Sequence, residues 1–419
     1  MPPHRHDRLF RRLPRRRLLE GLVAAGAWAC GTQLPANSAS TGDLSSPPGP
    51  PLTPRPPIPP LSDASFTARL DRVRSLAKDA GADLAVVTSG TTNFAYLAGA
   101  PVERSERLIA LFVPVEGEAT LLAPSFEVER VRRAVRVRAA LVGWEESRSP
   151  FDVVRDTLGA RAHGAVLVEP HTEYGTAAGL AHAFPDTKLV DGAAAFDSLR
   201  VVKDAEEIAR IRRAIAITED AFARAFDRLA PGVRDRDVAA SIRADFEREG
   251  VGGYALVQFG ALSALPHGHP VGAPLTPGTA VLIDGGCTVD GYESDITRTR
   301  WFGSEPPAEY VKITDVVREA QHAGIARARE GVEAQEVDRA ARAVITRAGY
   351  GPYFTHRTGH GLGMDGHEPI YMVEGNRAPL VQGCVFTIEP GIYLPARFGV
   401  RIEDDVCCGA DGAAVLTGA

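Results

Sequence analysis

Two aspartates, Asp284 and Asp295, lie on either side of Asp290-Gly291, a dipeptide typical of a two-residue β-hairpin loop. The neighbouring stretches VLI and ITRTRW favour a sheet face that is covered rather than wet. Two unpaired carboxylates on one buried face would repel each other, so this arrangement needs a cation between them. The alternative interpretation is a pair of solvent-facing aspartates on an exposed sheet.

The hairpin also predicts which residues face one another. Three facing pairs follow from that loop: Val289 with Tyr292, Asp284 with Thr297, and Gly286 with Asp295. Because side chains alternate along a strand, Asp295 shares a face with Thr297, and the two aspartates become diagonal neighbours about 7 Å apart at Cβ. Carboxylates at that distance can both reach a pair of cations about 3.5–4 Å apart. A one-residue bulge would break this register.

Further candidate ligands follow towards the carboxyl end. Glu389 ends the apolar stretch VFTIE, and Glu403 lies in VRIEDD. His360 lies in the stretch TGHGLGMDGHEP, whose glycines allow the backbone to approach a crowded site. His356 and His367 lie nearby, and spacing alone does not separate the three histidines. Carboxylates with one imidazole suit Mn, Co, Fe or Zn better than copper or an iron–sulfur cluster.

The pattern of apolar residues predicts a protein of the α/β (α+β) class with two domains. The first domain is expected over 62–199. It should begin with a helix that carries Leu70 and Val73 and ends at Gly81. Its strands are predicted at 84–88, 108–113, 119–123 and 165–169, and its further helices at about 126–135, 150–159 and 175–184.

The second domain, expected over 200–419, shows the order helix, helix, strand, strand twice. The first copy has a long helix ended by Pro231-Gly232, a helix stopped by Gly250, and strands at 280–284 and 293–301. The second copy has helices at about 311–329 and 335–348 and strands at 384–389 and 400–405. The repeat indicates a pseudo-symmetric duplication with an active site at the joint between its halves.

The composition is that of an ordinary globular protein, since 44% of the 419 residues are hydrophobic and 24% are charged. The formal net charge is −6, although residues 1–29 carry seven arginines against Asp7 and Glu20. The remainder is more acidic still, which argues against nucleic acid as a partner. The cysteines lack zinc-finger spacing and are expected to be small buried residues, with a disulfide left open if the protein is exported: Cys30, Cys287, Cys384, Cys407 and Cys408.

Residues 1–29 are predicted to be an export signal. The stretch RRRLL at 15–19 is similar to a twin-arginine signal, and the apolar run at 22–29 is shorter than the roughly 20 residues that a bilayer needs. The A-x-A cleavage pattern AWA is followed directly by Cys30, a candidate lipid-attachment site. The protein is then periplasmic or extracellular, and the alternative is a cytoplasmic protein with a basic disordered start. Residues 30–61, rich in Pro and Ser, are predicted to form a disordered linker.

Four stretches resemble, in the same order, the metal-binding motifs of the pita-bread metallopeptidases: IDGGCTVDGYESDITRTRWF, GHGLGMDGHE, TIEPGIY and VRIEDD. That group includes Xaa-Pro aminopeptidases, Xaa-Pro dipeptidases (prolidases) and methionine aminopeptidases. Upstream, DLAVVTSGTTNFAYLAG is similar to the amino-terminal domain of the proline-specific branch, which methionine aminopeptidases lack. The resemblance implies a creatinase-like amino-terminal α/β domain followed by a pseudo-symmetric pita-bread catalytic domain.

The resemblance also implies a site with two divalent cations, Mn first and Co, Zn or Fe as alternatives. Asp284 would bind one cation, His360 and Glu389 the other, and Asp295 and Glu403 both. The implied reaction is hydrolysis of the peptide bond before a proline at the second position of a peptide. A homodimer or larger homo-oligomer is implied as well.

Other residues receive roles from the same resemblance. Glu389 would also carry a proton to the leaving nitrogen. His267, in SALPHGHP, would contact the substrate and the developing oxyanion, and His367 would lie near the proline side. His356 and Arg401 would orient the substrate or support the ligands.

Two other functions stay open. One is a relative that acts on a small non-peptide, such as creatinase, an ectoine-type amide hydrolase or a sulfoniopropionate lyase. Creatinase-type chemistry lacks the full ligand set, so the five ligands argue against that member alone. The other is a binding protein on the same scaffold, although such proteins typically lose ligands.

Overall fold

The computed structural model of this chain describes residues 55–266, 268, 271–303 and 305–418. The described residues all belong to one compact unit, Pro54–Ala419. The predicted export signal and Cys30 therefore lie outside the described residues. Among the helices in these described ranges, none is both long and apolar enough to cross a membrane.

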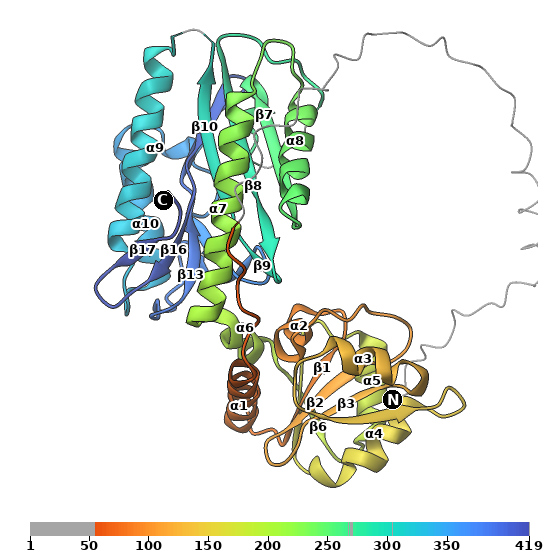
Figure 1. The fold of residues 1–419 in the computed structure, drawn as a ribbon. Coiled ribbons are helices and arrows are strands. Elements are labelled where there is room, and N and C mark those ends of the chain that lie inside the picture. Colours follow the sequence, from red (N-terminus) through yellow and green to blue (C-terminus); the bar gives the residue numbers. More distant parts are fainter. Residues whose placement is uncertain (1–54, 267, 269–270, 304, 419) are drawn as a thin grey trace, which may run out of the picture. The chain divides into compact units, whose positions relative to one another are not determined.

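The amino-terminal domain is a six-stranded mixed sheet with the strand order β4-β3-β2-β1-β5-β6 (Figure 1). Its elements are α1 (Asp63–Asp79), β1 (Leu84–Thr88), α2 (Thr92–Ala98), β2 (Ala110–Pro114), β3 (Thr120–Pro124), α3 (Val128–Ala134), β4 (Ala140–Trp144), α4 (Pro150–Leu158), β5 (Ala165–Val168), α5 (Tyr174–Ala183), β6 (Lys188–Asp191) and α6 (Ala193–Val201). Along β1, Ala85 and Val87 face one apolar core and Leu84 and Val86 face another. Helices therefore cover both faces of this sheet, as expected for an apolar strand such as LAVVT.

The predicted strands of this domain correspond to β1, β2, β3 and β5, and the predicted helices to α1, α3, α4 and α5. The sequence reasoning missed β4, β6, α2 and α6. Strands β4 and β6 form the two edges of the sheet and are only partly buried, so they lack a continuous apolar run. Helix α2 is a single seven-residue segment, too short to show a helical repeat.

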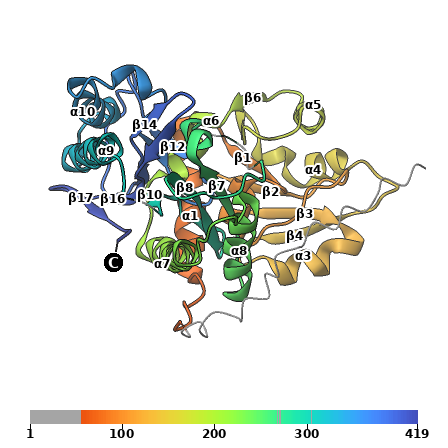
Figure 2. The same cartoon turned by 90° about the horizontal axis from the view of Figure 1, so that it is seen from above.

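The carboxyl-terminal domain contains two sheets and a separate hairpin. Its elements are α7 (Ala205–Asp227), α8 (Asp235–Arg248), β7 (Gly252–Phe259), β8 (Thr279–Val289), β9 (Tyr292–Glu293), β10 (Ile296–Phe302), α9 (Ala308–Arg327), α10 (Ala334–Arg347), β11 (Gly359–Gly361), β12 (Glu368–Met372), β13 (Val385–Ile388), β14 (Gly391–Leu394), β15 (Phe398–Arg401), β16 (Asp404–Cys408) and β17 (Ala413–Val415). One sheet has the order β10-β8-β7 with β9 paired to β8, the second has the order β12-β11-β13-β16-β17, and β14 pairs with β15. Helices α7 and α8 pack on the first sheet and α9 and α10 on the other half (Figures 1 and 2), which gives the predicted repeat of helix pairs and strands.

The hairpin has the predicted register. Val289 pairs with Tyr292, and Asp284 pairs with Thr297. The ladder is interrupted between β9 and β10, but the count is the same on both sides, so no bulge shifts the aspartates. At the interruption, a Cβ added to Gly286 would collide with the carbonyl of Ser294, so the close approach of the strands requires glycine there. 

The predicted strand at 400–405 is wrong as a single element. The structure divides it into β15, which pairs with β14, and β16, which pairs with β13. Glu403 lies between them and forms an isolated bridge with Thr297 of the first sheet. The break arises because the chain changes partners at this point, and it brings Glu403 to the aspartate hairpin.

The final part of the predicted linker, residues 55–61, lies along α7. Arg213 donates through Nη2 to the carbonyl oxygen of Pro56 at 2.6 Å, and Arg210 donates through Nη2 to that of Pro59 at 2.7 Å. Arg55 donates to the carbonyl oxygen of Ala216 at 3.1 Å. These bonds hold the segment immediately before α1, which begins after the N-cap Ser62.

Candidate active site

All five predicted metal ligands line one cavity of about 850 Å³. His356, His367 and Arg401 line the same cavity. The elements that position the ligands come from both halves of the repeat. Asp284 lies within β8 and Asp295 directly before β10, whereas His360 lies in β11, Glu389 follows β13 and Glu403 separates β15 from β16. The site therefore lies at the joint between the halves.

The candidate ligand atoms form three overlapping groups, and within each group the atoms lie within 4.8 Å of one another. The groups are Asp284, Asp295 and Glu403; His360, Glu389 and Glu403; and Asp295, His360 and His367. Asp295, His360 and Glu403 each belong to two groups, and Asp295 and Glu403 are the two carboxylates among them. This sharing is the arrangement that two neighbouring cations with bridging carboxylates would need.

Burial makes the cluster of acids unfavourable without a compensating positive charge. Desolvation raises the pKa of Asp295, and the nearby charge of Asp284 raises it further. Desolvation likewise raises the pKa of Glu403, with a second contribution from Asp295. The pKa of Glu389 is raised to about 7, mainly by desolvation. Divalent cations are the chemical partners that such a set of buried carboxylates fits.

His360 has the protonation state of a metal ligand. Burial, followed by the neighbouring His367, lowers its pKa to about 3, so the imidazole is neutral. Its Nδ1 lies 3.1 Å from the carbonyl oxygen of Gly361, which favours the tautomer that leaves a lone pair on Nε2. Nε2 lies 3.5 Å from Oε1 of Glu389 and 3.7 Å from Oδ2 of Asp295.

Arg401 is buried beside the carboxylates. It donates through Nη2 to Oδ2 of Asp284 at 2.7 Å and through Nε to Oγ1 of Thr297 at 2.9 Å. Thr297 in turn donates through Oγ1 to Oε2 of Glu403 at 2.5 Å. The structure thus places Arg401 against two predicted ligands, one directly and one through Thr297.

Two supporting residues escaped the sequence reasoning. The hydroxyl of Tyr254, on β7, donates to Oδ1 of Asp295. The backbone N–H of Asp295 donates to Oδ2 of Asp405 at 3.2 Å. Asp405 belongs to the acidic motif VRIEDD and could have been found from it, whereas Tyr254 lies outside every motif.

The histidines near His360 have different surroundings. The His367 ring lies 3.9 Å from the His360 ring, measured between centroids. Nε2 of His356 lies 2.7 Å from the hydroxyl of Tyr393, and its Nδ1 lies 3.9 Å from Oε2 of Glu389. His267 lies outside the described residues, so its predicted contact with the substrate stays a prediction.

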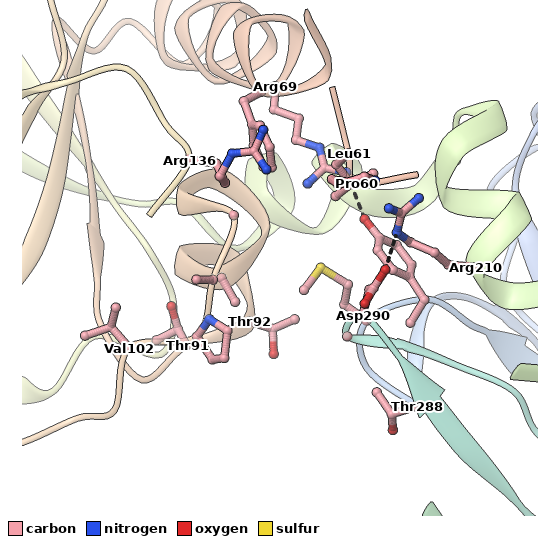
Figure 3. A pocket seen from close by; sticks show the side chains of 18 of the residues that line it. Pro60, Leu61, Arg69, Thr91, Thr92, Val102, Arg136, Arg210, Thr288 and Asp290 are labelled. Atoms are coloured by element: carbon pink, nitrogen blue, oxygen red, sulfur yellow. Dashed lines mark hydrogen bonds and ion pairs between the residues drawn. The ribbon is translucent and has the colours of Figure 1, made fainter. Parts of the chain in front are cut away.

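A second cavity of about 830 Å³ lies between α1, α2 and the tip of the hairpin (Figure 3). Its polar lining includes Arg69, Arg210 and Asp290, and an ion pair of 3.2 Å joins the last two. Its lining includes none of the predicted site residues among the described ones. The chemistry therefore belongs to the first cavity.

The fold and the site define a metal-dependent hydrolase with a pita-bread catalytic domain. Residues 69–202 match the Creatinase/Prolidase N-terminal domain, and residues 209–410 match metallopeptidase family M24. The chain belongs to metallopeptidase family M24. The predicted family and two-domain fold are confirmed, and membership implies divalent metal ions.

Three similar proteins match this chain over almost their whole length. The Xaa-Pro dipeptidase of Lactobacillus helveticus is 33% identical over 363 residues, which cover 83% of this chain and 96% of the relative. The crystal structure of the prolidase from Thermococcus sibiricus has a TM-score of 0.76 and 34% identity, covering 84% of this chain and 97% of that one. The crystal structure of the dipeptidase PepE from Mycobacterium ulcerans has a TM-score of 0.78 and 34% identity, covering 86% and 98%.

Proposed function

We propose that the protein hydrolyses the peptide bond that precedes proline in Xaa-Pro peptides, with dipeptides as its main substrates. The observation that carries this proposal is the sharing of Asp295 and Glu403 between groups of candidate ligands in one cavity. The names of the relatives, Xaa-Pro dipeptidase and prolidase, support the substrate class. An Xaa-Pro aminopeptidase, which would accept longer peptides, is the neighbouring alternative.

The proposed metal ligands are Asp284, Asp295, His360, Glu389 and Glu403, which would hold two divalent cations. Manganese is proposed first, with Co, Zn or Fe as alternatives. When bound, such cations polarise a carbonyl oxygen and lower the pKa of water.

The protein's own side chains would move the proton and hold the substrate. Glu389 would accept a proton at its carboxylate from the attacking water and donate it to the leaving nitrogen. His367, in the cavity wall, would donate a hydrogen bond to the substrate, and His267 is proposed to do the same. Arg401 would hold Asp284 in place through their ion pair.

Peptide cleavage with a defined panel tests this proposal. The purified protein is incubated with Mn²⁺ and with Xaa-Pro dipeptides, Xaa-Pro-Yaa tripeptides and matched peptides without proline. Release of proline from dipeptides alone supports a dipeptidase, and cleavage of tripeptides supports the aminopeptidase alternative. If metal is bound but no Xaa-Pro peptide is cleaved, both are wrong, and the relative acting on a small non-peptide amide takes their place.

Export, lipid attachment at Cys30 and assembly as a homodimer or larger homo-oligomer are proposals that rest on sequence and resemblance. Mass spectrometry of the mature protein would detect cleavage after Ala29 and a lipid on Cys30. An intact residue 1 in protein recovered from the cytoplasm would contradict export. Sedimentation velocity would measure the oligomer.

A further inference from the structure

The segment that carries His367 is a short glycine-rich loop, Gly363–His367. It lies between β11 and β12, and Glu368, the first residue of β12, follows it directly. Its Asp365, Gly366 and His367 line the active-site cavity. Glycine loses more conformational freedom on folding than other residues, so a loop of this sequence needs fixed contacts to hold one conformation.

Glu368 is the anchor of this loop. Its side chain is 2% exposed, and its Oε1 accepts hydrogen bonds from the backbone N–H groups of Met364 at 3.0 Å and Asp365 at 3.1 Å. The same carboxylate accepts from Arg200 at Oε1 and from Nζ of Lys203 at Oε2, at 2.9 Å for the lysine. A buried carboxylate needs such partners, because desolvation without them is costly.

Arg200, near the end of α6, connects three separate segments. Its guanidinium donates to Glu368, to Oδ2 of Asp365 at 2.7 Å through Nη2, and to Oδ1 of Asn93 at 3.1 Å through Nε. Its side chain is 10% exposed. The planar guanidinium can hold several acceptors in fixed directions, which a lysine ammonium cannot do in the same way.

Two further contacts fix the same arrangement from the amino-terminal domain. Asn93 donates through Nδ2 to Oε1 of the buried Glu169 at 3.0 Å, which orients the amide that accepts from Arg200. Thr92 donates through Oγ1 to Oδ1 of Asp365 at 2.5 Å. Both oxygens of Asp365 are therefore held, one by Thr92 of α2 and the other by Arg200 of α6.

We propose that Arg200 is a positioning residue for the reaction, acting through Glu368 and Asp365 to hold the loop Gly363–His367 against the active-site cavity. The inference rests on the proposed peptidase function for its kinetic part only. Lys203 pairs with the same carboxylate, and its other hydrogen bond goes to the carbonyl oxygen of Val201, outside the loop. Arg200 and Lys203 thus both neutralise Glu368, whereas Arg200 alone of the two also binds Asp365.

The variants are Arg200→Gln, which removes the positive charge, and Arg200→Lys, which keeps the charge but lacks the planar set of guanidinium N–H donors. Arg224→Gln is the matched control, because Arg224 donates through Nε to the buried Asp245 at 2.7 Å on helices α7 and α8, away from the loop. Two measurements are made on the full-length protein. One is hydrogen exchange of the peptide containing Met364 and Asp365, and the other is kcat and KM for an Xaa-Pro dipeptide at equal metal content.

Arg200→Gln should raise loop exchange at least tenfold and lower kcat/KM by about 10- to 100-fold, since small misplacements of an active-site group can cost about 100-fold. Arg200→Lys should recover part of both, and Arg224→Gln should change neither. The inference would be overturned if the loop of Arg200→Gln exchanged hydrogen at the wild-type rate. It would also be overturned if Arg224→Gln changed loop exchange and kcat/KM as much as Arg200→Gln does. If Arg200→Gln does not fold, Arg200→Lys decides by the same criteria. An inactive wild-type protein would count against the proposed function, while the exchange data would still decide whether Arg200 holds the loop.

Discussion

The guanidinium of Arg401 donates to Oδ2 of Asp284 at 2.7 Å, although the two residues lie on different sheets and 117 positions apart. The Arg401 side chain is 3% exposed and that of Asp284 is 14% exposed. A buried ion pair of this kind offsets part of the repulsion among the carboxylates. It also joins the aspartate hairpin to the strand β15.

Replacement of Arg401 by Gln should destabilise the metal-free protein by about 3–5 kcal/mol, because Asp284 loses the guanidinium that pairs with its carboxylate. Urea denaturation in the presence of a chelator measures the free energy of unfolding. The matched control is Arg339→Gln, which breaks an exposed pair with Glu374 and should cost about 0–1 kcal/mol. Equal losses in the two variants would contradict the role assigned to Arg401.

Asp295→Asn should abolish peptidase activity while the protein remains folded. Burial and the surrounding carboxylates raise the pKa of Asp295, so a neutral side chain of the same shape relieves both costs in the cation-free state. Activity and thermal unfolding are measured together. Asp290→Asn, in the loop of the same hairpin, is the control that should keep activity. Retained activity in Asp295→Asn would rule out the bridging role.

Metal ions should stabilise the protein more at neutral and basic pH than in acid. In the cation-free site the pKa of Glu389 is raised to about 7, above its ordinary value of 4.5. A carboxyl group with a raised pKa stabilises the folded state when the pH lies below its ordinary pKa of 4.5. This stabilisation is lost as the pH rises through about 7. Cations bind the deprotonated groups, so their effect should grow over the same range.

The check is the rise in Tm caused by Mn²⁺, measured between about pH 5 and about pH 8. The rise should be small at the acid end and large at the basic end. Asp295→Asn protein should show a weaker dependence. A rise in Tm that is equal at both ends would contradict the assigned pKa shift.

The segment 55–61 should contribute to stability. A chain that starts at Ser62 loses the bonds from Arg210 to Pro59 and from Arg213 to Pro56, each worth about 1 kcal/mol. We expect it to unfold at lower urea concentration than a chain that starts at Arg55. Arg213→Gln in the longer chain should reproduce part of the loss. Identical midpoints for the two chains would show that the segment is a passive tether.

Local signals predicted the parts of the site that local geometry determines. The loop Asp290-Gly291 is a turn signal of two residues, and it was sufficient to predict that Asp284 faces Thr297. His360 could be separated from His356 and His367 only by resemblance, because glycine-rich loops carry no register. The bridge between Thr297 and Glu403 joins residues 106 positions apart, so no periodicity could reveal it.

The contacts that support the site were harder to predict. Tyr254 reaches Asp295 across 41 positions, and Arg200 reaches Glu368 across 168. Such pairs depend on how two domains or two sheets pack, and the sequence around each residue resembles an ordinary helix or strand. The sequence therefore indicated the candidate ligands and the supporting Arg401, but not Tyr254 or Arg200.

Anomalous X-ray diffraction from crystals soaked in Mn²⁺ tests the central claim most directly. We predict two peaks about 3.5–4 Å apart. Asp284 should contact one, His360 and Glu389 the other, and Asp295 and Glu403 both. A single peak, or peaks that these five side chains do not contact, would contradict the two-metal site.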